Sequence, residues 1–369
     1  MKKVLWVGII GSLLVTSAIA QTFTSIHSFN GPDGNYPYAG LVFHRGLLYG
    51  TTDEGGPAGS RGTIYSVDAQ GNVLVWAVLT ADTGIFPEGG LSVGKNGDLY
   101  GTAIYGGVHN KGTIFKVLNS KVQVRYDFNS HTGPGPYSLV EGPDGGFYGT
   151  TSFGGRNGYG SVFRAIRNNT DITTIHDFTY DDGSLPYGRL ILGRDGNFYG
   201  TSYFGGSLGN GTIFRISPAG TFTLLHSFTG SDGGNPSSGV IQGADGAFYG
   251  TTQVGGSQLL GVIYKTDDQG NVTLLHSFNY SDGANPQASL IQVQSGELYG
   301  TSPQGGTFGN GTIFKITTDG VYTKLYDFIG EPDGKIPLSG LTQTPDGTIY
   351  GTTNQGGASD LGTVFKLTF

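Results

Sequence analysis

Residues 147–155 read FYGTTSFGG, and near-copies of this phrase recur along the whole chain. Aligned on the tyrosine that precedes Gly-Thr, the copies are spaced by 51, 48, 51, 50, 50 and 51 residues, which makes seven units. A period near 50 residues is typical of propellers and solenoids, because each unit must stack on its neighbours to bury its faces. The phrase therefore predicts a repeat architecture.

The interior of one unit indicates which repeat architecture this is. Residues 186–228 contain four short β-type runs in the order RLILG, NFYGTS, GTIFRIS and TFTLLHSF. Asp195-Gly196 is a hairpin signal between the first two runs, and Gly220 lies between the last two. Four antiparallel strands per unit, seven units and the absence of helical periodicity predict an all-β, seven-bladed β-propeller.

The two ends of the chain predict how the ring closes. After residue 20 the sequence begins with a fourth-strand run, QTFTSIHSF, and it ends with a third-strand run, GTVFKLTF. We expect the N-terminal strand to complete the C-terminal blade, which hides both free sheet edges. The two ends of a solenoid do not meet, so a solenoid would not explain why one end of the chain lacks the strand that the other end supplies.

The repeated phrase itself is interpreted as structural, since a sequence present in every unit cannot mark one active site. Both faces of a middle strand are buried between blades, and FYGT offers large residues for both faces. Its glycine leaves room where the backbone or a ring of a neighbouring blade could come close. We expect the Gly-Gly that follows to adopt positive φ as the chain leaves the strand.

The N-terminus has the layout of a secretory signal. Two lysines at positions 2 and 3 precede an apolar run over residues 4–15 and the small-residue sequence AIA at 18–20. We expect cleavage after residue 20, which leaves residues 21–369 as a single propeller domain. The apolar run is too short for a membrane span, so a secreted or periplasmic location without membrane insertion is predicted.

Composition excludes several kinds of chemistry. The chain has no cysteine, which excludes disulfides, thiolate metal sites and a Cys nucleophile. A net charge of −7 repels phosphate backbones, so nucleic acid is not an expected partner. We expect a monomer without a cofactor.

Two recurrent features resemble metal sites and are interpreted otherwise. Histidines 27, 176, 226 and 276 share one outer-strand position on separate blades, where they cannot converge on one metal ion. The Asp-Gly loops between units could hold Ca²⁺, but each usually offers a single Asp, and turn formation accounts for it. The sequence therefore predicts no metal site.

One face of the propeller carries the loops that lead into each first strand and the loops between the second and third strands. We expect the functional residues on this face, at positions where the repeats differ in sequence. Units one to four carry tyrosines and charges on this face, whereas units five to seven offer mainly Gln, Asn and Ser. No catalytic residue is assigned. The predicted ligand-binding residues at a Tyr-rich channel mouth are Tyr38, Glu88, Tyr105, Tyr137, Arg156, Tyr159, Tyr187, Arg189 and Tyr203.

Three functions fit such a surface. The first is a non-catalytic binding module for an extracellular polysaccharide or cell-wall glycan. Tyr rings can stack on sugar rings, and the neighbouring charged groups can form hydrogen bonds with sugar hydroxyls. A propeller that binds a surface protein, or that serves surface architecture, with the tyrosines as hot spots, is the alternative. The second alternative is a glycan-cleaving enzyme, either a hydrolase with Glu54 and Glu88 or a lyase. The residues a lyase could use are His109, His131, Tyr137, Arg156 and Arg189.

The repeat also resembles a known family. The stretch LYGTSPQGGTFGNGTIFKI at residues 298–316, like FYGTTSFGG followed by GSVFR, is similar to the tandem repeat of the GloVer-type choice-of-anchor proteins. The resemblance covers essentially all of residues 21–369 and implies a secreted or surface-displayed bacterial protein, often attached through a C-terminal sorting segment. The chain stops at Phe369 inside the last unit, which departs from that pattern and favours a soluble exported form. Kelch propellers are a more distant likeness, because the expected late Trp is missing.

Overall fold

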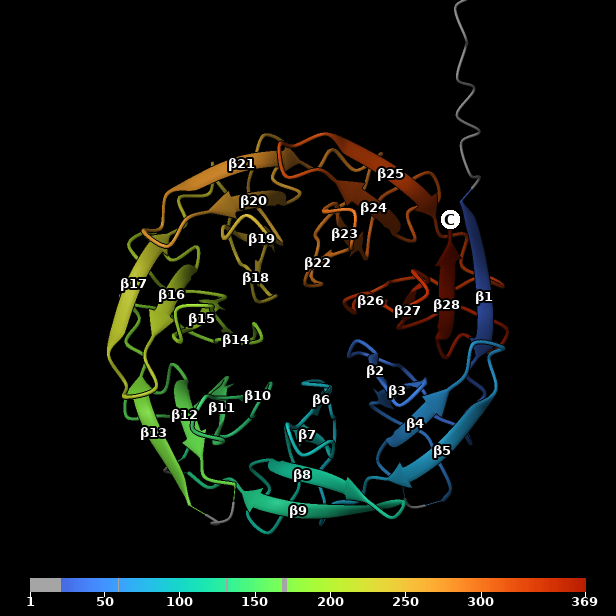
Figure 1. Ribbon diagram of the computed structural model, residues 1–369, viewed down its shortest axis with the longest axis horizontal. Coiled ribbons are helices and arrows are strands. Elements are labelled where there is room, and N and C mark those ends of the chain that lie inside the picture. The colour runs from blue at the N-terminus through green and yellow to red at the C-terminus, as the bar shows by residue number, and fades with distance from the viewer. Residues whose placement is uncertain (1–20, 59, 131, 168–170) are drawn as a thin grey trace, which may run out of the picture.

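The computed structural model describes residues 21–58, 60–130, 132–167 and 171–369. These residues form seven four-stranded antiparallel sheets arranged as blades around a central axis, which confirms the predicted β-propeller (Figure 1). The described part of the chain contains no helix, and so none that is long and apolar enough to cross a membrane. The predicted signal at residues 1–20 lies outside the described residues.

Each blade runs outward from the axis in sequence order (Figure 1). The innermost strands of blades one to seven are β2 (Val42–His44), β6 (Leu91–Val93), β10 (Val140–Glu141), β14 (Ile191–Leu192), β18 (Ile241–Gln242), β22 (Ile291–Gln292) and β26 (Thr342–Gln343). The second strands are β3 (Leu47–Thr52), β7 (Leu99–Ala103), β11 (Phe147–Thr151), β15 (Phe198–Ser202), β19 (Phe248–Thr252), β23 (Leu298–Ser302) and β27 (Ile349–Thr353).

The outer half of each blade has the same regularity. The third strands are β4 (Thr63–Val67), β8 (Thr113–Leu118), β12 (Ser161–Ala165), β16 (Thr212–Ile216), β20 (Val262–Thr266), β24 (Thr312–Ile316) and β28 (Thr363–Thr368). The outermost strands are β5 (Val73–Val78), β9 (Lys121–Asp127), β13 (Ile172–Asp177), β17 (Phe222–Ser227), β21 (Val272–Ser277), β25 (Tyr322–Asp327) and, for blade seven, β1 (Thr22–Ser28).

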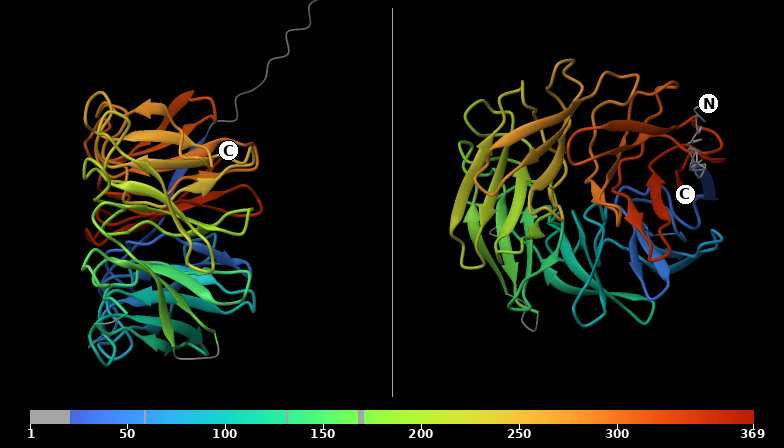
Figure 2. Two further views of the ribbon diagram at one scale, coloured as in Figure 1. Left: turned by 90° about the vertical axis from the view of Figure 1, so that its left-hand side faces the viewer. Right: turned by 45° about the horizontal axis from the view of Figure 1, so that its top comes forward.

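The ring is closed by its first strand. β1 pairs antiparallel with β28, from Thr22 opposite Thr368 to Ser28 opposite Thr363. The N-terminal strand thus completes blade seven, as the phase of the two ends predicted. Seen from its side, the closed ring is a thick disc with loops on both faces (Figure 2).

The Phe-Tyr pair of the repeated phrase joins neighbouring blades. Tyr148 of blade three stacks on Phe198 of blade four with ring centroids 4.2 Å apart. Tyr199 of blade four stacks in the same way on Phe248 of blade five at 4.1 Å. All four side chains are buried, and each ring contact contributes on the order of 1 kcal/mol beyond the area that it removes from water. The structural interpretation of the phrase is confirmed.

The glycine of the phrase leaves room for an aromatic ring of its own blade. The prediction that a ring or backbone of the neighbouring blade approaches this glycine was therefore wrong. Gly149 pairs across the sheet with Phe163, and a Cβ at Gly149 would lie 2.6 Å from Phe163 Cζ and 2.2 Å from the carbonyl oxygen of Ser138. A direct cross-strand pair brings the ring over the glycine, which explains the difference. Gly154 and Gly155 have φ of 79° and 69°, as predicted.

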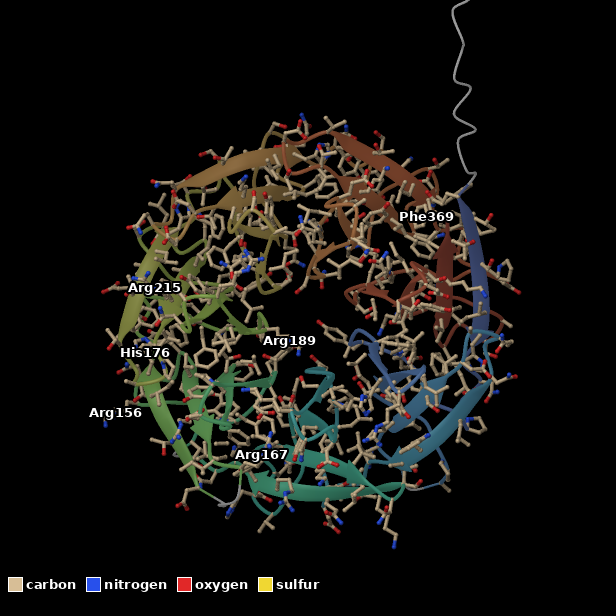
Figure 3. The ribbon with its side chains drawn as sticks, viewed as in Figure 1. Arg156, Arg167, His176, Arg189, Arg215 and Phe369 are labelled. Atoms are coloured by element: carbon tan, nitrogen blue, oxygen red, sulfur yellow. The ribbon has the colours of Figure 1, made fainter. Side chains whose placement is uncertain are left out.

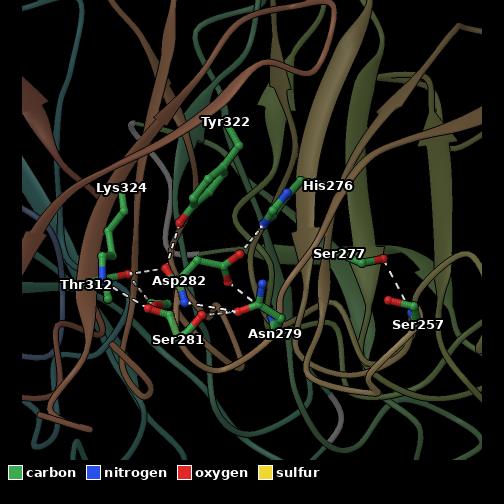
Figure 4. Close-up of polar contacts among 10 residues, drawn as sticks. Ser257, His276, Ser277, Asn279, Ser281, Asp282, Thr312, Tyr322 and Lys324 are labelled. Atoms are coloured by element: carbon green, nitrogen blue, oxygen red, sulfur yellow. Dashed lines mark hydrogen bonds and ion pairs between the residues drawn. The ribbon is translucent and has the colours of Figure 1, made fainter. Parts of the chain in front are cut away.

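The recurrent histidines contact aspartates in the loops that lead into the next blade. His276 Nε2 lies 3.1 Å from Asp282 Oδ2, and Asp282 Oδ1 accepts a hydrogen bond from the backbone N–H of Asn279 (Figure 4). The histidine ring also stacks on Tyr322 of the next blade at 3.9 Å. The same side-chain contact joins His27 to Asp33 and His226 to Asp232. The sequence indicated a structural role for these histidines but not their partnership with the loop aspartates.

Candidate functional site

The innermost strands and the segments that lead into them enclose a cavity of about 580 Å³ on the ring axis. One equivalent position lines this cavity in every blade, the residue after the linker proline. In chain order its occupants are Tyr38, Glu88, Tyr137, Tyr187, Ser237, Gln287 and Leu338. Aromatic and acidic side chains therefore gather on blades one to four, while the other three blades present smaller or uncharged groups.

A hydrogen bond connects the side chains of blades two and three, and Tyr38 of blade one lines the cavity beside them. The hydroxyl of Tyr137 donates to Glu88 Oε2 at 2.5 Å. Burial first, and then the charge of Glu88, raise the pKa of Tyr38 to about 12. Burial and the same charge also raise the pKa of Tyr137. Both phenols therefore stay neutral and able to donate near neutral pH.

An arc of rings continues toward blade five. The ring centroids of Tyr137 and Tyr187 lie 5.1 Å apart, and those of Tyr187 and Tyr203 lie 5.7 Å apart. Tyr203 follows the end of β15, and its hydroxyl donates to Gln253 Oε1, which follows the end of β19, at 2.5 Å. Tyr105 lies beside this arc: the residue is exposed, and it contributes to the raised pKa of Tyr187.

A second carboxyl group, that of Asp53, interacts with the charge of Glu88. Asp53 follows the end of β3, at the position that Tyr203 occupies in blade four. Burial, the charge of Glu88 and the charge of Glu54 raise the pKa of Asp53 to about 8. Burial also raises the pKa of Glu88, against the lowering effect of its hydrogen bond from Tyr137. Glu54 itself is exposed, and its pairing with Glu88 stays a prediction, while Asp53 is a largely buried carboxyl group that the sequence analysis did not assign to the site.

Arg189 reaches through the cavity instead of facing these carboxyl groups. Its side chain projects into the channel from blade four, and Nη2 donates to Ser92 Oγ of blade two at 2.9 Å (Figure 3). Blade three, which lies between them, has one residue fewer in the segment from Pro136 to Leu139 than the other blades have. Surrounding protein lowers the pKa of Arg189, yet its side chain is open to channel solvent, and an arginine stays cationic at neutral pH.

Two of the predicted site residues lie elsewhere. Arg156 is at the outer edge of the ring, where its guanidinium Nε is 3.4 Å from Asp177 Oδ2 (Figure 3). Tyr159 packs its ring against Tyr180 at 5.6 Å and does not line the cavity. Of the histidines considered for a lyase, His109 is exposed and His131 lies outside the described residues.

The structure thus brings together six of the nine predicted residues, Tyr38, Glu88, Tyr137, Tyr187, Arg189 and Tyr203, with Tyr105 beside them. Sequence reasoning left Asp53 and Gln253 out of the site. Their equivalence to Tyr203, directly after a second strand, was the signal that could have found them. In the described ranges no three His, Cys, Asp or Glu side chains are grouped so as to hold a metal ion.

A closed seven-bladed propeller with an asymmetrically lined cavity on its axis places the protein among repeat propellers with a candidate ligand site at the channel. The Gloeobacter/Verrucomicrobia repeat matches residues 11–193, 82–243 and 187–369, and the chain belongs to that family. The choice-of-anchor assignment and the kelch likeness stay predictions. No curated protein matches the chain.

Solved structures share the fold. A streptogramin B lyase is 18% identical with a TM-score of 0.63, and the alignment covers 94% of this chain and 97% of the lyase. Virginiamycin B lyase from Staphylococcus aureus is 17% identical with a TM-score of 0.60, over 95% of this chain and 99% of that enzyme. At such low identity the likeness concerns the fold alone.

Proposed function

We propose that the protein is a binding module that takes a segment of an extracellular polysaccharide or cell-wall glycan in the cavity at its channel mouth. The observation that carries this proposal is the asymmetry of the position after the linker proline. All seven positions are equivalent in the fold, so packing alone gives no reason for three tyrosines and a glutamate on four adjacent blades. A ligand that contacts one side of the channel gives such a reason.

The chemistry of the lining suits a sugar. A cavity of about 580 Å³ lies within the range of roughly 300 to 1,000 Å³ that is common for ligand sites. Tyr38, Tyr137 and Tyr187 offer ring faces for the C–H surface of a pyranose. Glu88 accepts hydrogen bonds from hydroxyl groups, and the phenols both donate and accept.

A buried carboxyl group whose pKa is raised by the charge of Glu88 favours glycan hydrolysis as a second candidate function. Because the pKa of Asp53 is raised to about 8, this group is mostly protonated at pH 7 and could donate a proton to a leaving oxygen. Glu88, held by the Tyr137 hydroxyl, could then serve as the carboxylate of the pair. A bound polymer that is also shortened, with the activity lost in Asp53→Asn, would establish this function.

Native affinity electrophoresis of the chain without residues 1–20 tests the binding proposal. We expect one or more polysaccharides from a neutral and charged panel to retard the protein, and Tyr187→Ala to abolish the retardation. Ser237→Ala is the matched control, because it changes the equivalent position in blade five and should leave the retardation intact. No retardation across the panel, or equal losses in both variants, would refute the proposal and favour a protein partner.

A further inference from the structure

We infer that Arg189 is the binding site for a carboxylate inside the channel, and that the glycan taken by the cavity contains uronate residues. This inference rests on the proposed function and names the chemical class of the ligand. Three observations carry it: the place of Arg189 in the repeat, the contact that holds its guanidinium, and the lack of an acidic partner among the described residues.

Arg189 departs from the repeat at a position where the other blades have almost no side chain. It is the third residue after the linker proline of blade four, and blade three is one residue shorter in this segment. The equivalent residues of the other five blades all line the cavity, and they are Gly40, Gly90, Gly239, Ser289 and Gly340. The fold is therefore built at this point without a large side chain, and packing alone does not explain an arginine.

The guanidinium is held by a second departure from the repeat. Nη2 of Arg189 donates to Ser92 Oγ at 2.9 Å, and Ser92 Oγ donates to the carbonyl oxygen of Leu139 at 2.8 Å. Ser92 lies in β6 opposite the repeated tyrosine. In five other blades the residue opposite this tyrosine is apolar and lines the cavity, namely Val42, Val140, Ile191, Ile241 and Ile291. Ser92 thus fixes the cation at the depth of the innermost strands, on a largely apolar band of the channel wall.

No acidic side chain neutralises this cation in the part of the chain that the structure describes. Burial acts on the pKa of Arg189 without a contribution from any charged group. Glu88 also lines the cavity, but it accepts the hydroxyl of Tyr137 at 2.5 Å and forms no ion pair with Arg189. Arg164, by comparison, lies 2.6 Å from Asp144. The guanidinium in the channel is therefore available to an anion from outside the protein.

A carboxylate fits the free side of this guanidinium. Arginine has five N–H donors in a planar fork that can bind both oxygens of a carboxylate, and the contact of Arg189 with Ser92 uses one donor. Apolar walls weaken screening by solvent, so the attraction is stronger here than at an open surface. Leu139 follows Tyr137 by two residues, which is roughly 7 Å of extended chain. A sugar against the rings of Tyr137 and Tyr187 can therefore direct a carboxylate toward Arg189.

Calorimetric titration at pH 7 with matched oligosaccharides tests the inference. The probes are the hexamers of galacturonate and of mannuronate, each compared with its methyl ester, which has the same backbone without the charge. We expect at least one acid to bind about tenfold more tightly than its ester, and Arg189→Gln to remove most of that preference. Because glycine or serine occupies the equivalent position in five blades, the variant should fold, which its urea midpoint of unfolding checks.

Two further variants separate carboxylate binding from a purely structural tie between blades two and four. Ser92→Ala releases the guanidinium but keeps its charge, so it should reduce the preference for the acid less than Arg189→Gln does. Arg125→Gln is the control: it removes one positive charge from an exposed position of β9, on the outside of the ring. This control should leave the preference intact.

The outcomes separate the inference from the proposed function. Equal or tighter binding of the esters would overturn the inference and leave glycan binding supported. A preference for the acid that Arg189→Gln leaves unchanged, or that Arg125→Gln reduces equally, would also overturn the inference. Failure of all four probes to bind would overturn the inference, and together with a negative electrophoresis panel it would overturn the proposed function as well.

Discussion

The hydroxyl of Tyr137 lies 2.5 Å from Oε2 of Glu88, although the two residues are 49 positions apart and belong to different blades. Each is the first residue after a linker proline, so the hydrogen bond joins equivalent points of consecutive repeats. With the contact between the rings of Tyr137 and Tyr187, this repeated position links blades two, three and four at the cavity. The candidate site is a property of adjacent blades rather than of one blade.

Replacement of Tyr137 by Phe should weaken ligand binding with little loss of stability. The variant keeps the ring but removes the donor to Glu88, which costs roughly 0.5 to 1.5 kcal/mol for a typical hydrogen bond. It should also raise the pKa of Glu88 further, since this hydrogen bond lowers it. Affinity for the bound glycan and the urea midpoint of unfolding are the measurements.

Tyr322→Phe is the control for that variant. It removes a hydrogen bond to the carbonyl oxygen of Asp282, on the outer wall of the ring. It should lower stability by a similar amount and leave affinity unchanged. If both variants reduced affinity equally, the Tyr137 hydroxyl would have no special part in binding.

The stability of the protein should depend on pH through Asp53. Its pKa is 3.8 in the unfolded chain and about 8 in the folded protein, so folding favours the protonated form. The contribution of this group to stability is fully present below about pH 4 and is lost as the pH rises through 8. Asp53→Asn should therefore be more stable than the unmodified protein at pH 8, by about 1 to 3 kcal/mol, and should gain little at pH 4.

Urea unfolding at both pH values measures this difference. Glu54→Gln removes the exposed neighbouring charge that contributes last to the raised pKa of Asp53, so it is the comparison variant and should show a smaller pH-dependent gain. A gain for Asp53→Asn that is the same at pH 4 and pH 8 would contradict the prediction.

The glycine of the repeated phrase should not tolerate a methyl group. In Gly149→Ala the added carbon would meet the Ser138 carbonyl oxygen at 2.2 Å and the Phe163 ring at 2.6 Å. We expect a loss of about 2 kcal/mol or more in the free energy of unfolding, because backbone and ring must both move. Gly347→Asn is the comparison: this hairpin glycine has φ of 89° with no neighbour within 4 Å, and Asn accepts that conformation. Similar losses in the two variants would argue against a steric cause.

Removal of the first strand should open the ring. A chain that begins at residue 29 lacks β1 and leaves β28 with an unpaired edge. It also loses the stack of Phe23 on Tyr326, whose ring centroids lie 3.8 Å apart. We expect a lower melting temperature and self-association through the exposed edge, measured by calorimetry and size-exclusion chromatography. A chain that begins at residue 21 retains β1 and is the control; equal behaviour of the two chains would show that closure contributes little.

The fold was predictable to the level of individual strands, with the innermost strands shorter than expected. RLILG was predicted as a strand, yet β14 contains only Ile191 and Leu192. Near the axis the blades converge, and the chain on either side of these two residues turns to form the cavity wall and the hairpin. The candidate site was predictable only in part. Tyr187 and Arg156 were both predicted as site residues, yet Tyr187 lines the cavity and Arg156 lies at the outer edge of the ring.

The sequence by itself determined the number of blades, the order of strands within them and the way the ring closes, because these depend on local alternation, turn residues and the phase of the two ends. Only the tertiary structure decided which variable side chains meet. Asp53 follows a second strand and Glu88 precedes a first strand, and no spacing within the repeat relates them. The charge of Glu88 in blade two nevertheless raises the pKa of Asp53 in blade one, because neighbouring blades converge at the axis and Asp53 is largely buried there.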